Sequence, residues 1–556
     1  MNKKVCSFPI LFALLTLLIG TCAVVFPASA QAAPTSTGSI TVSGTVARSY
    51  DAYQIFSANV VDGDSDAKTA TDLAWASDAV RDAALPVLHS AGMPKSQTTA
   101  QEASEWLNAD SHLTSALSAQ LARSLQSSDA ESVALNAGTT AELSCGYWLI
   151  VADDATISQD EAGTAPIMAL VGGSAVTVKP KAATPKVQKH VLEDSTAAWQ
   201  KAADATVADD LYWRLLATVP AGLTAYDAYT VRFVDTMSAG LDPSKVAASM
   251  RVYVAAGADG GFDAVSTGKD GRVGTEPAKG WTDITAQCAT KVAADGKTFT
   301  VRTGDLIAAL GGADAFTAGA RVVAVYNAPL NSACSHGIAK GNPNEAYLRY
   351  PRSPFADQSG DAGFTRTPSD DACAYTWDLA LTKRGSDGDK PLAGAVLSIA
   401  DDRGRTLAAD GTWDAEGKAT VTTGEDGRVT VSGVDSGKLE VRELKAPMGY
   451  TAFEGTRSVT VKAEGLDVDQ VAAAKPKLTI TAESPLRADS ADGSTGSLEA
   501  SLINTPTGTP PSITTGGFMP STGDMAMYAA AAAAVAGAVL IVVALLVKRG
   551  GGSHKE

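Results

Sequence analysis

The sequence is poor in the residues and motifs from which most catalytic and metal centres are built. Its five histidines lie at positions 89, 112, 190, 336 and 554, and their spacing fits no metal-binding pattern. It contains no Walker loop, no HExxH helix and no G-x-S-x-G turn. These absences predict no metal and no cofactor, and they make an enzyme that acts on outside substrates the weakest hypothesis for this chain.

Basic charge is also scarce. The 45 lysines and arginines are outnumbered by 61 acidic residues, which leaves a net charge of −16 and a pI near 4.8. Because no basic stripe offsets this acidity, nucleic acid is not expected as a partner, and the charge favours solubility. The 556 residues are 45% hydrophobic, enough to bury the cores of about three domains.

The first 30 residues resemble a secretory signal peptide. Lys3 and Lys4 precede an apolar stretch, and Ala28-Ser29-Ala30 supplies the small residues of a cleavage site. The mature chain is therefore predicted to be secreted and to keep four of the six cysteines, for which three pairings are open. We favour a disulfide between Cys288 and Cys334, which lie in one predicted domain, with free buried thiols as the equal alternative.

The C-terminus carries a second targeting signal. Residues 506–524 are rich in Pro, Thr and Gly and contain Met519-Pro520-Ser521-Thr522-Gly523, residues 525–547 form an uncharged apolar run, and 548–556 are a basic tail. The run matches the ~20 residues that cross a bilayer, and the basic tail marks its cytoplasmic end. This order resembles the sorting signal of Gram-positive sortase substrates, with Met519 in the usual place of Leu. The resemblance implies cleavage between Thr522 and Gly523; the alternative is an ordinary tail anchor after a proline turn.

Residues 31–181 form the first predicted domain. Apolar and polar residues alternate in the strand around Ile40, a capping box at Thr99 and Glu102 begins helical sequence, and leucines recur every four residues from Leu113 to Leu125. The segments YDAYQIF at 50–56 and GYWLI at 146–150 resemble the N-terminal domain of sortase-assembled major pilins. That resemblance implies a β-sandwich with a helical insertion.

The end of this domain, VTVKPK at 176–181, resembles the pilin motif V-x-V-Y-P-K. In that family the lysine amine attacks the sortase-bound threonine of the next subunit, a role that falls here on Lys181. Strand alternation places Lys179 and Lys181 on the face opposite the valines, and both are expected to face solvent. Lys179 remains open as the acceptor, and a solvated basic linker is the plainer alternative.

The second predicted domain spans residues 182–357 and contains a lysine on the apolar face of a strand. Lys189 shares its parity with the flanking valines, Asp235 ends the apolar run VRFV, and Asn344 begins the strand NEAYLRY. Burial lowers the pKa of an amine and raises that of a carboxyl, so both tend to be neutral. The trio resembles the isopeptide site of the pilin middle domain, in which Lys and Asn side chains join while the acid shuttles the proton. Asn342 is an alternative partner for Lys189. The plainer alternative is that Lys189, Asp235 and Asn344 occupy turn or surface positions.

The third predicted domain, residues 370–505, repeats this arrangement. Lys383, Glu443 and Asn504 each share the inward parity of an apolar strand. The segment LEVRELKAPMGY at 439–450 resembles the collagen-adhesin B-type repeat, which implies a second Lys–Asn isopeptide bond with Glu443 as the proton shuttle. Each bond is expected to join the first and last strands of its domain.

Taken together, the motifs identify the chain as similar to a major pilin of the sortase-assembled fimbriae. The resemblance implies three tandem immunoglobulin-like β-sandwiches, a mainly β fold and no turnover of outside substrates. It further implies sortase, identical subunits and peptidoglycan as partners, with minor pilins and host surface ligands as further candidates, and a wall-anchored fimbrial location after transient membrane anchoring. The rival hypothesis is a singly displayed adhesin or minor pilin, which needs the sorting signal but not Lys181.

Overall fold

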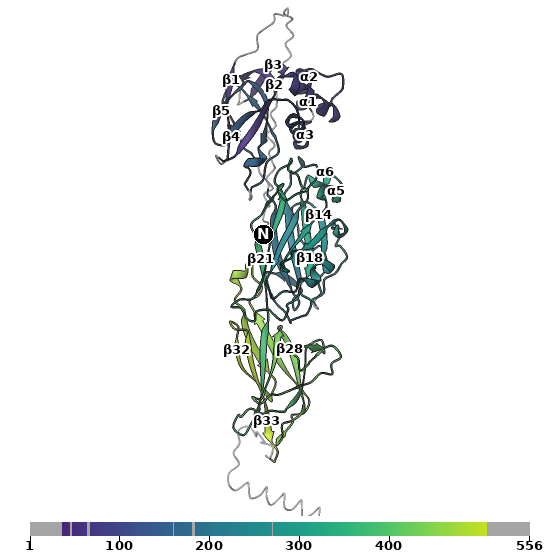
Figure 1. Cartoon of the computed structure of the whole chain (residues 1–556), viewed down its shortest axis with the longest axis vertical. Helices are drawn as coiled ribbons and strands as arrows, with labels where there is room; N and C mark the ends of the chain where they lie inside the picture. The colour runs from purple at the N-terminus through teal and green to yellow at the C-terminus, as the bar shows by residue number, and fades with distance from the viewer. Residues whose placement is uncertain are drawn as a thin grey trace, which may run out of the picture.

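A computed structural model describes residues 36–508, apart from gaps at 45–46, 64–66, 110, 159–160, 181–183 and 269–270. Three bodies, each built on its own pair of β-sheets, are stacked along the long axis (Figure 1). The prediction of a mainly β chain of three successive sandwiches is confirmed. The signal peptide, Lys181, the sorting motif and the apolar run lie outside the described residues, among which no helix is long and apolar enough to span a bilayer.

The first module pairs a three-stranded sheet with a five-stranded one. The small sheet has the order β5-β1-β8 and the larger one the order β3-β2-β6-β7, with β4 also paired to β2. Their bounds are β1 Thr37–Val42, β2 Ser49–Asp62, β3 Lys68–Trp75, β4 Val133–Asn136, β5 Thr140–Ser144, β6 Gly146–Ala152, β7 Ile167–Val171 and β8 Val176–Val178. Ile40 and Val42 are buried between the sheets, as the alternation around them predicts.

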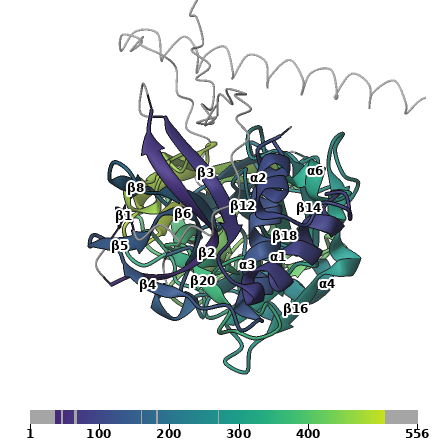
Figure 2. The same cartoon turned by 90° about the horizontal axis from the view of Figure 1, so that it is seen from above.

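The predicted helical insertion lies between β3 and β4, followed later by the short η2 (Asp154–Thr156). It consists of α1 (Asp78–Ser90), α2 (Ala100–Asn108) and α3 (Ser115–Gln126), which gather beside the β2–β3 ribbon (Figure 2). The capping box at Thr99 is present. The leucine stripe is shorter than predicted, because Leu113 precedes α3 and stays 38% exposed. The buried members of the stripe are Leu117, Leu121 and Leu125.

The middle module packs a six-stranded sheet on a seven-stranded one. Their orders are β10-β9-β12-β18-β14-β15 and β11-β21-β19-β13-β17-β16, with β20 paired to β19. The strands are β9 Lys186–Glu193, β10 Ala198–Gln200, β11 Ala202–Asp204, β12 Tyr212–Val219, β13 Arg232–Met237, β14 Arg251–Ala256, β15 Thr282–Asp283, β16 Ala289–Val292, β17 Thr298–Arg302, β18 Ala320–Asn327, β19 Asn342–Pro351, β20 Phe364–Arg366 and β21 Asp370–Tyr375. The short helices are η3 Pro243–Lys245, α4 Val246–Ser249, η4 Thr285–Gln287, α5 Leu306–Ala309 and α6 Ala313–Phe316.

Strand β21 moves the expected boundary between the second and third modules. The sequence places residues 370–375 at the start of the third domain, but β21 hydrogen-bonds to β11 and β19 of the middle module. Only Thr376 separates β21 from the strand that begins the third module. The expectation that Asn344 lies on the last strand of its domain is therefore wrong, because β21 follows β19 in the same sheet.

The third module is again a pair of sheets, with orders β27-β22-β33-β29 and β25-β24-β23-β28-β30-β31; β32 pairs with β33, and β26 with β23. The strands are β22 Trp377–Gly385, β23 Val396–Ala400, β24 Thr406–Leu407, β25 Trp413–Asp414, β26 Val421–Thr422, β27 Arg428–Val434, β28 Gly437–Lys445, β29 Tyr450–Thr451, β30 Thr456–Glu464, β31 Lys477–Ala482, β32 Leu486–Asp492 and β33 Ser497–Pro506, with η5 at Val471–Ala473. The first strand, β22, and the last, β33, are parallel neighbours.

The first module meets the middle one through Arg123 on α3. The guanidinium donates hydrogen bonds to Asp227 Oδ1 at 3.0 Å and to the carbonyls of Ala225 and Pro354, both at 3.2 Å. It also lies over the ring of Phe355, 5.5 Å from its centroid. Because these partners come from two separate segments of the middle module, one side chain restrains how the modules are oriented.

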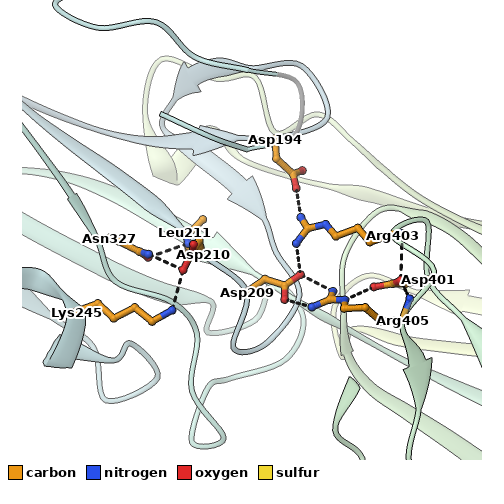
Figure 3. Close-up of polar contacts among 9 residues, drawn as sticks. All are labelled: Asp194, Asp209, Asp210, Leu211, Lys245, Asn327, Asp401, Arg403 and Arg405. Carbon is orange, nitrogen blue, oxygen red and sulfur yellow. Dashed lines mark hydrogen bonds and ion pairs between the residues drawn. The ribbon is translucent and has the colours of Figure 1, made fainter. Parts of the chain in front are cut away.

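Two arginines, Arg403 and Arg405, join the third module to the middle one (Figure 3). Arg405 donates to both carboxylate oxygens of Asp209, at 2.5 and 2.7 Å, and to Asp401 of its own module at 2.7 Å. Arg403 donates to Asp209 at 3.0 Å and to Asp194 at 3.5 Å. Such bidentate pairing constrains direction as well as distance, so this joint is restrained in orientation.

Candidate cross-link sites

The core of the middle module brings together side chains from both of its sheets. Lys189 on β9 and Tyr326 on β18 come from one sheet, while Asp235 on β13 and Asn344 on β19 come from the other. All four side chains are fully buried. The strand parity of the sequence therefore predicted correctly that the lysine, the acid and the amide face inward.

A connected set of hydrogen bonds links these four residues. Lys189 Nζ contacts Asp235 Oδ2 and donates to the Tyr326 hydroxyl at 2.8 Å. That hydroxyl donates to Asp235 Oδ2 at 2.8 Å and accepts a bond of 2.8 Å from Asn344 Nδ2. Asp235 Oδ1 and Asn344 Oδ1 are buried and find no hydrogen-bond partner among the described residues.

Burial drives the lysine and the acid of this site toward their neutral forms. The pKa of Lys189 is lowered because its amine is removed from water, although the Asp235 charge opposes this. The pKa of Asp235 is raised for the same reason, against the opposing effect of Lys189. A neutral amine is a nucleophile and a protonated carboxyl is a general acid, so burial favours the reactive form of both groups.

Aromatic rings enclose the lysine amine. Lys189 Nζ lies 5.4 Å from the Trp213 ring centroid and 5.3 Å from that of Tyr326. Phe299 packs edge-on against the Tyr326 ring with centroids 4.8 Å apart. These rings leave the amine no exposure to solvent, which strengthens every polar interaction inside the site.

The alternative amide, Asn342, is held by other partners. It is buried on the same strand, but its Oδ1 accepts from the Ser335 backbone N–H at 2.8 Å and its Nδ2 donates to the carbonyls of Ser335 and Ala374 at 2.9 and 3.2 Å. Asn344 instead contacts the Tyr326 hydroxyl. The hydrogen bonds therefore favour Asn344 as the partner of Lys189.

Tyr326 is the member of this site that sequence reasoning missed. It lies six residues after Ala320 on β18 and shares the parity of the residues that face the module's main core, although the other face of this strand is buried as well. A tyrosine among small and branched apolar residues is a detectable signal, because a buried hydroxyl requires a partner. Which partner it meets depends on the opposite sheet.

The third module holds a similar set of side chains. Lys383 on β22 and Asn504 on β33 lie on neighbouring parallel strands, and Glu443 projects from β28 of the facing sheet. Lys383 Nζ is 3.5 Å from Glu443 Oε1 and donates to the Leu502 carbonyl at 3.3 Å. Asn504 Nδ2 donates directly to both Glu443 oxygens, at 2.9 and 3.0 Å.

Burial again changes the state of the amine. The side chains of Lys383 and Glu443 have no solvent exposure, and Asn504 is 2% exposed. Removal from water lowers the pKa of Lys383 to about 8, although Glu443 opposes the shift. A substantial fraction of this amine is therefore neutral near physiological pH, whereas an exposed lysine is almost wholly charged.

Both sites contain what amide exchange between two side chains requires. Each has an amine nucleophile, a carboxamide electrophile and a carboxyl group for proton transfer, in a core that excludes water. Attack of the amine on the amide carbon forms a new C–N bond and releases ammonia. The side chains that would react are buried at both sites, so the chemistry they support joins groups of the chain itself.

The predicted acceptor segment lies at the edge of the first module. Among the strands that the structure describes, β8 pairs with β1 at one edge of its three-stranded sheet, with Val178 buried and Thr177 and Lys179 exposed. The alternation predicted from the sequence therefore holds for Lys179. Lys181 itself falls among residues that the structure does not describe.

The predicted disulfide between Cys288 and Cys334 is wrong, because all four cysteines of the described chain are free. Cys288 follows η4, and its thiol donates to the Ile284 carbonyl at 3.3 Å. Cys334 lies in the loop between β18 and β19, 3.7 Å from His336 Nε2. Membership of one module does not make two cysteines neighbours, since these two lie in different loops with different partners.

Three modules built from paired sheets, two of them with a buried lysine, acid and amide, define a modular β-sandwich protein with candidate internal cross-links. Residues 378–475, within the third module, match the family model described as the SpaA prealbumin-like fold domain. The trypsin-resistant surface T6 protein of Streptococcus pyogenes serotype M6 is 30% identical over 143 residues. That match covers 24% of this chain and 24% of the relative, so the chain spans about a quarter of the length of that curated relative.

Solved structures of similar architecture cover more of the chain at lower identity. The T6 backbone pilin of serotype M6 Streptococcus pyogenes is 17% identical with a TM-score of 0.45, over 85% of this chain and 99% of that one. The major pilin SpaD of Corynebacterium diphtheriae is 16% identical with a TM-score of 0.40, over 86% of this chain and 100% of the other. The major pilin BcpA of Bacillus cereus is 10% identical with a TM-score of 0.38, over 85% and 99%.

Proposed function

We propose that the chain is a backbone pilin, the repeating shaft subunit of a covalently polymerised fibre on the surface of a Gram-positive bacterium. The observation that carries this proposal is the recurrence of a buried lysine, acid and asparagine in two successive modules. A buried lysine is costly, and two such sets in one chain call for a reason beyond packing. A covalent joint within each module supplies that reason.

In each site the lysine amine attacks the carboxamide carbon of the asparagine. The new amide bond joins Lys189 to Asn344 or Lys383 to Asn504, and each reaction releases one ammonia. Asp235 and Glu443 move the protons, and their contacts with the reacting groups support that role. The products have no charge on the former lysine, so the cost of burying an ammonium disappears.

The placement of these bonds suits a fibre under tension. In the third module the bond joins neighbouring first and last strands, so a pull enters through β22 and leaves through β33 without loading the rest of the sandwich. In the middle module the bond joins β9 to β19, and the chain leaves through the adjacent strand β21. Here the load crosses one strand pairing between β19 and β21 before it reaches the next module.

Polymerisation follows from the two ends of the chain. A sortase cuts between Thr522 and Gly523 and transfers the threonyl carbonyl to Lys181 of a neighbouring subunit, while the apolar run holds the precursor in the membrane until cleavage. The position of β8 at a sheet edge, with Lys179 exposed, supports access of an enzyme to the end of that strand. The last subunit is passed to peptidoglycan, and minor pilins and host ligands are further partners in adhesion.

The acceptor lysine distinguishes a shaft subunit from the singly displayed adhesin or minor pilin. Cell-wall extracts of the native organism, run on a denaturing gel, should show a ladder of high-mass species. Lys181→Ala should collapse the ladder to a monomer, and the matched control Lys179→Ala should keep it. A single band from the unmodified protein contradicts the shaft proposal, and a ladder lost only in Lys179→Ala moves the acceptor to Lys179.

The internal bonds are tested separately by mass. The secreted ectodomain should weigh less than its sequence mass by two ammonia, about 17 Da each, in reduced protein. Peptide mapping should recover Lys189 joined to Asn344, and Lys383 joined to Asn504. An ectodomain with its full sequence mass contradicts both cross-links, whatever the gel shows.

A further inference from the structure

The two candidate cross-link sites differ in how the acid reaches the amide. In the third module the Glu443 carboxylate accepts from Asn504 Nδ2 directly, at 2.9 and 3.0 Å. In the middle module the acid is aspartate, one methylene shorter, and Asn344 Nδ2 donates instead to the Tyr326 hydroxyl at 2.8 Å. That hydroxyl donates to Asp235 Oδ2, also at 2.8 Å. The tyrosine hydroxyl therefore makes the contact with the amide that the longer acid makes in the third module.

We propose that Tyr326 is a catalytic residue of the middle module, relaying a proton from Asp235 to the nitrogen that leaves Asn344. This inference rests on the proposed Lys189–Asn344 bond and adds a residue to it. The hydroxyl lies within 2.8 Å of both the attacking Lys189 Nζ and the leaving Asn344 Nδ2. One oxygen thus holds the incoming and the outgoing nitrogen in the same small volume.

The proton path balances without any outside reactant. Neutral Lys189 Nζ attacks the Asn344 carboxamide carbon, and the carbonyl electron pair moves onto Oδ1 in a tetrahedral intermediate. The protonated Asp235 gives its proton to the Tyr326 oxygen as the tyrosine passes its own proton to Nδ2. Nζ then returns a proton to the Asp235 carboxylate, which it already contacts, and so regenerates the acid. The C–Nδ2 bond breaks, Oδ1 returns its electron pair, and ammonia leaves the new amide.

The surroundings of Tyr326 suit a relay that stays neutral between transfers. Burial is the main reason that the pKa of Tyr326 lies well above its ordinary value, and the nearby Asp235 charge adds to the effect. The hydroxyl therefore keeps its proton at rest and does not act as a free base. The edge-on contact with Phe299 fixes the ring, and no part of the residue is exposed. A fixed hydroxyl in a dry core transfers protons only to the groups it touches.

The alternative is that Tyr326 serves only to fill the core. Tyr326→Phe separates the two roles, because it keeps the ring and removes the relay. Unlinked full-length ectodomain, isolated under denaturing conditions, is refolded by dilution, and its mass is followed with time. The Lys189–Asn344 bond should form about 100-fold more slowly or not at all, as expected for loss of a proton-transfer group. The third-module bond should form at the wild-type rate within the same molecule.

Two further variants make the result specific. Tyr229→Phe removes the hydroxyl of another fully buried tyrosine in the same core and should leave both bonds unchanged. Tyr326→Phe combined with Asp235→Glu gives the middle site the longer acid of the third module, and it should restore the missing bond.

Each result is decisive. A wild-type rate in folded Tyr326→Phe overturns the relay and leaves the cross-link itself in place. A folded double variant that fails to link also overturns it, and this variant decides the matter if the single one does not fold. Absence of the middle bond from the unmodified protein is a different outcome, because it removes the cross-link on which the relay depends.

Discussion

Removing the proposed third-module cross-link should produce a large, measurable loss of stability in that module alone. The change is Lys383→Met, which keeps an unbranched side chain of similar length in the buried position and cannot form an amide. The proposed bond would close a loop from β22 to β33, and closing a loop of about 100 residues or more removes denatured-state entropy worth about 4–5 kcal/mol by analogy with disulfides.

The size of the thermal shift follows from the size of the module. The third module runs from β22 to β33, about 130 residues, so its unfolding entropy near 60 °C is about 0.27 kcal/mol per kelvin. Dividing the loop-closure free energy by this entropy gives a melting temperature lower by about 15–20 °C. Differential scanning calorimetry of the ectodomain should show one transition moving by this amount while the others stay in place.

The control for this experiment is Lys438→Met. Lys438 lies on β28 of the same module with its side chain 52% exposed, and its pairing with Glu440 is a surface contact worth little. It should shift the transition by no more than about 1–2 °C. Mass spectrometry should show the deficit falling from two ammonia to one in Lys383→Met and unchanged in the control. A shift below about 5 °C in a variant that has lost its bond would refute the loop-closure argument.

The remaining predictions concern pH and the joint between modules. Asn504→Ala leaves Lys383 unlinked, with a pKa lowered to about 8 from 10.5, so the unfolded chain binds more protons across that interval. The free energy of unfolding of Asn504→Ala should therefore rise by about 3 kcal/mol from pH 8 to 10.5, whereas that of Lys383→Met should show no such rise. If chemical denaturation gives both variants the same dependence of unfolding free energy on pH, the lowered pKa of Lys383 is contradicted. Arg405→Ala removes the bidentate pair with Asp209, so small-angle scattering should show a broader distribution of shapes while each module melts within about 2 °C of wild type. An unchanged distribution of shapes in the scattering data would mean that Arg405 does not restrain the orientation of the third module relative to the middle one.

Strand alternation accounts for most of what the sequence predicted correctly. Lys189, Asp235 and Asn344 were placed inward because each shares the parity of apolar neighbours, and all three are buried. The same argument placed Lys383 and Glu443 correctly. Side chains on a strand alternate between its two faces whatever the rest of the fold does, so this information is present in a few consecutive residues.

Local pattern failed where the answer depended on pairing between distant segments. The sequence of β21 predicts the start of the third domain, yet this strand is hydrogen-bonded to β19 of the middle module. Cys288 and Cys334 share a module but lie in separate loops, so the predicted disulfide does not form. The start of one helix was also misplaced, because Leu113 fits the leucine spacing of α3 but lies before the first residue of that helix.

The sequence by itself determined which residues turn inward, because that choice is made strand by strand through a backbone repeat of two. Only the tertiary structure decided which inward residues meet. Asn344 and not Asn342 contacts Tyr326, and Tyr326 lies beside Asp235, because two sheets pack face to face in one relative position. The register between sheets is set by the packing of a whole core, and no short stretch of sequence contains it.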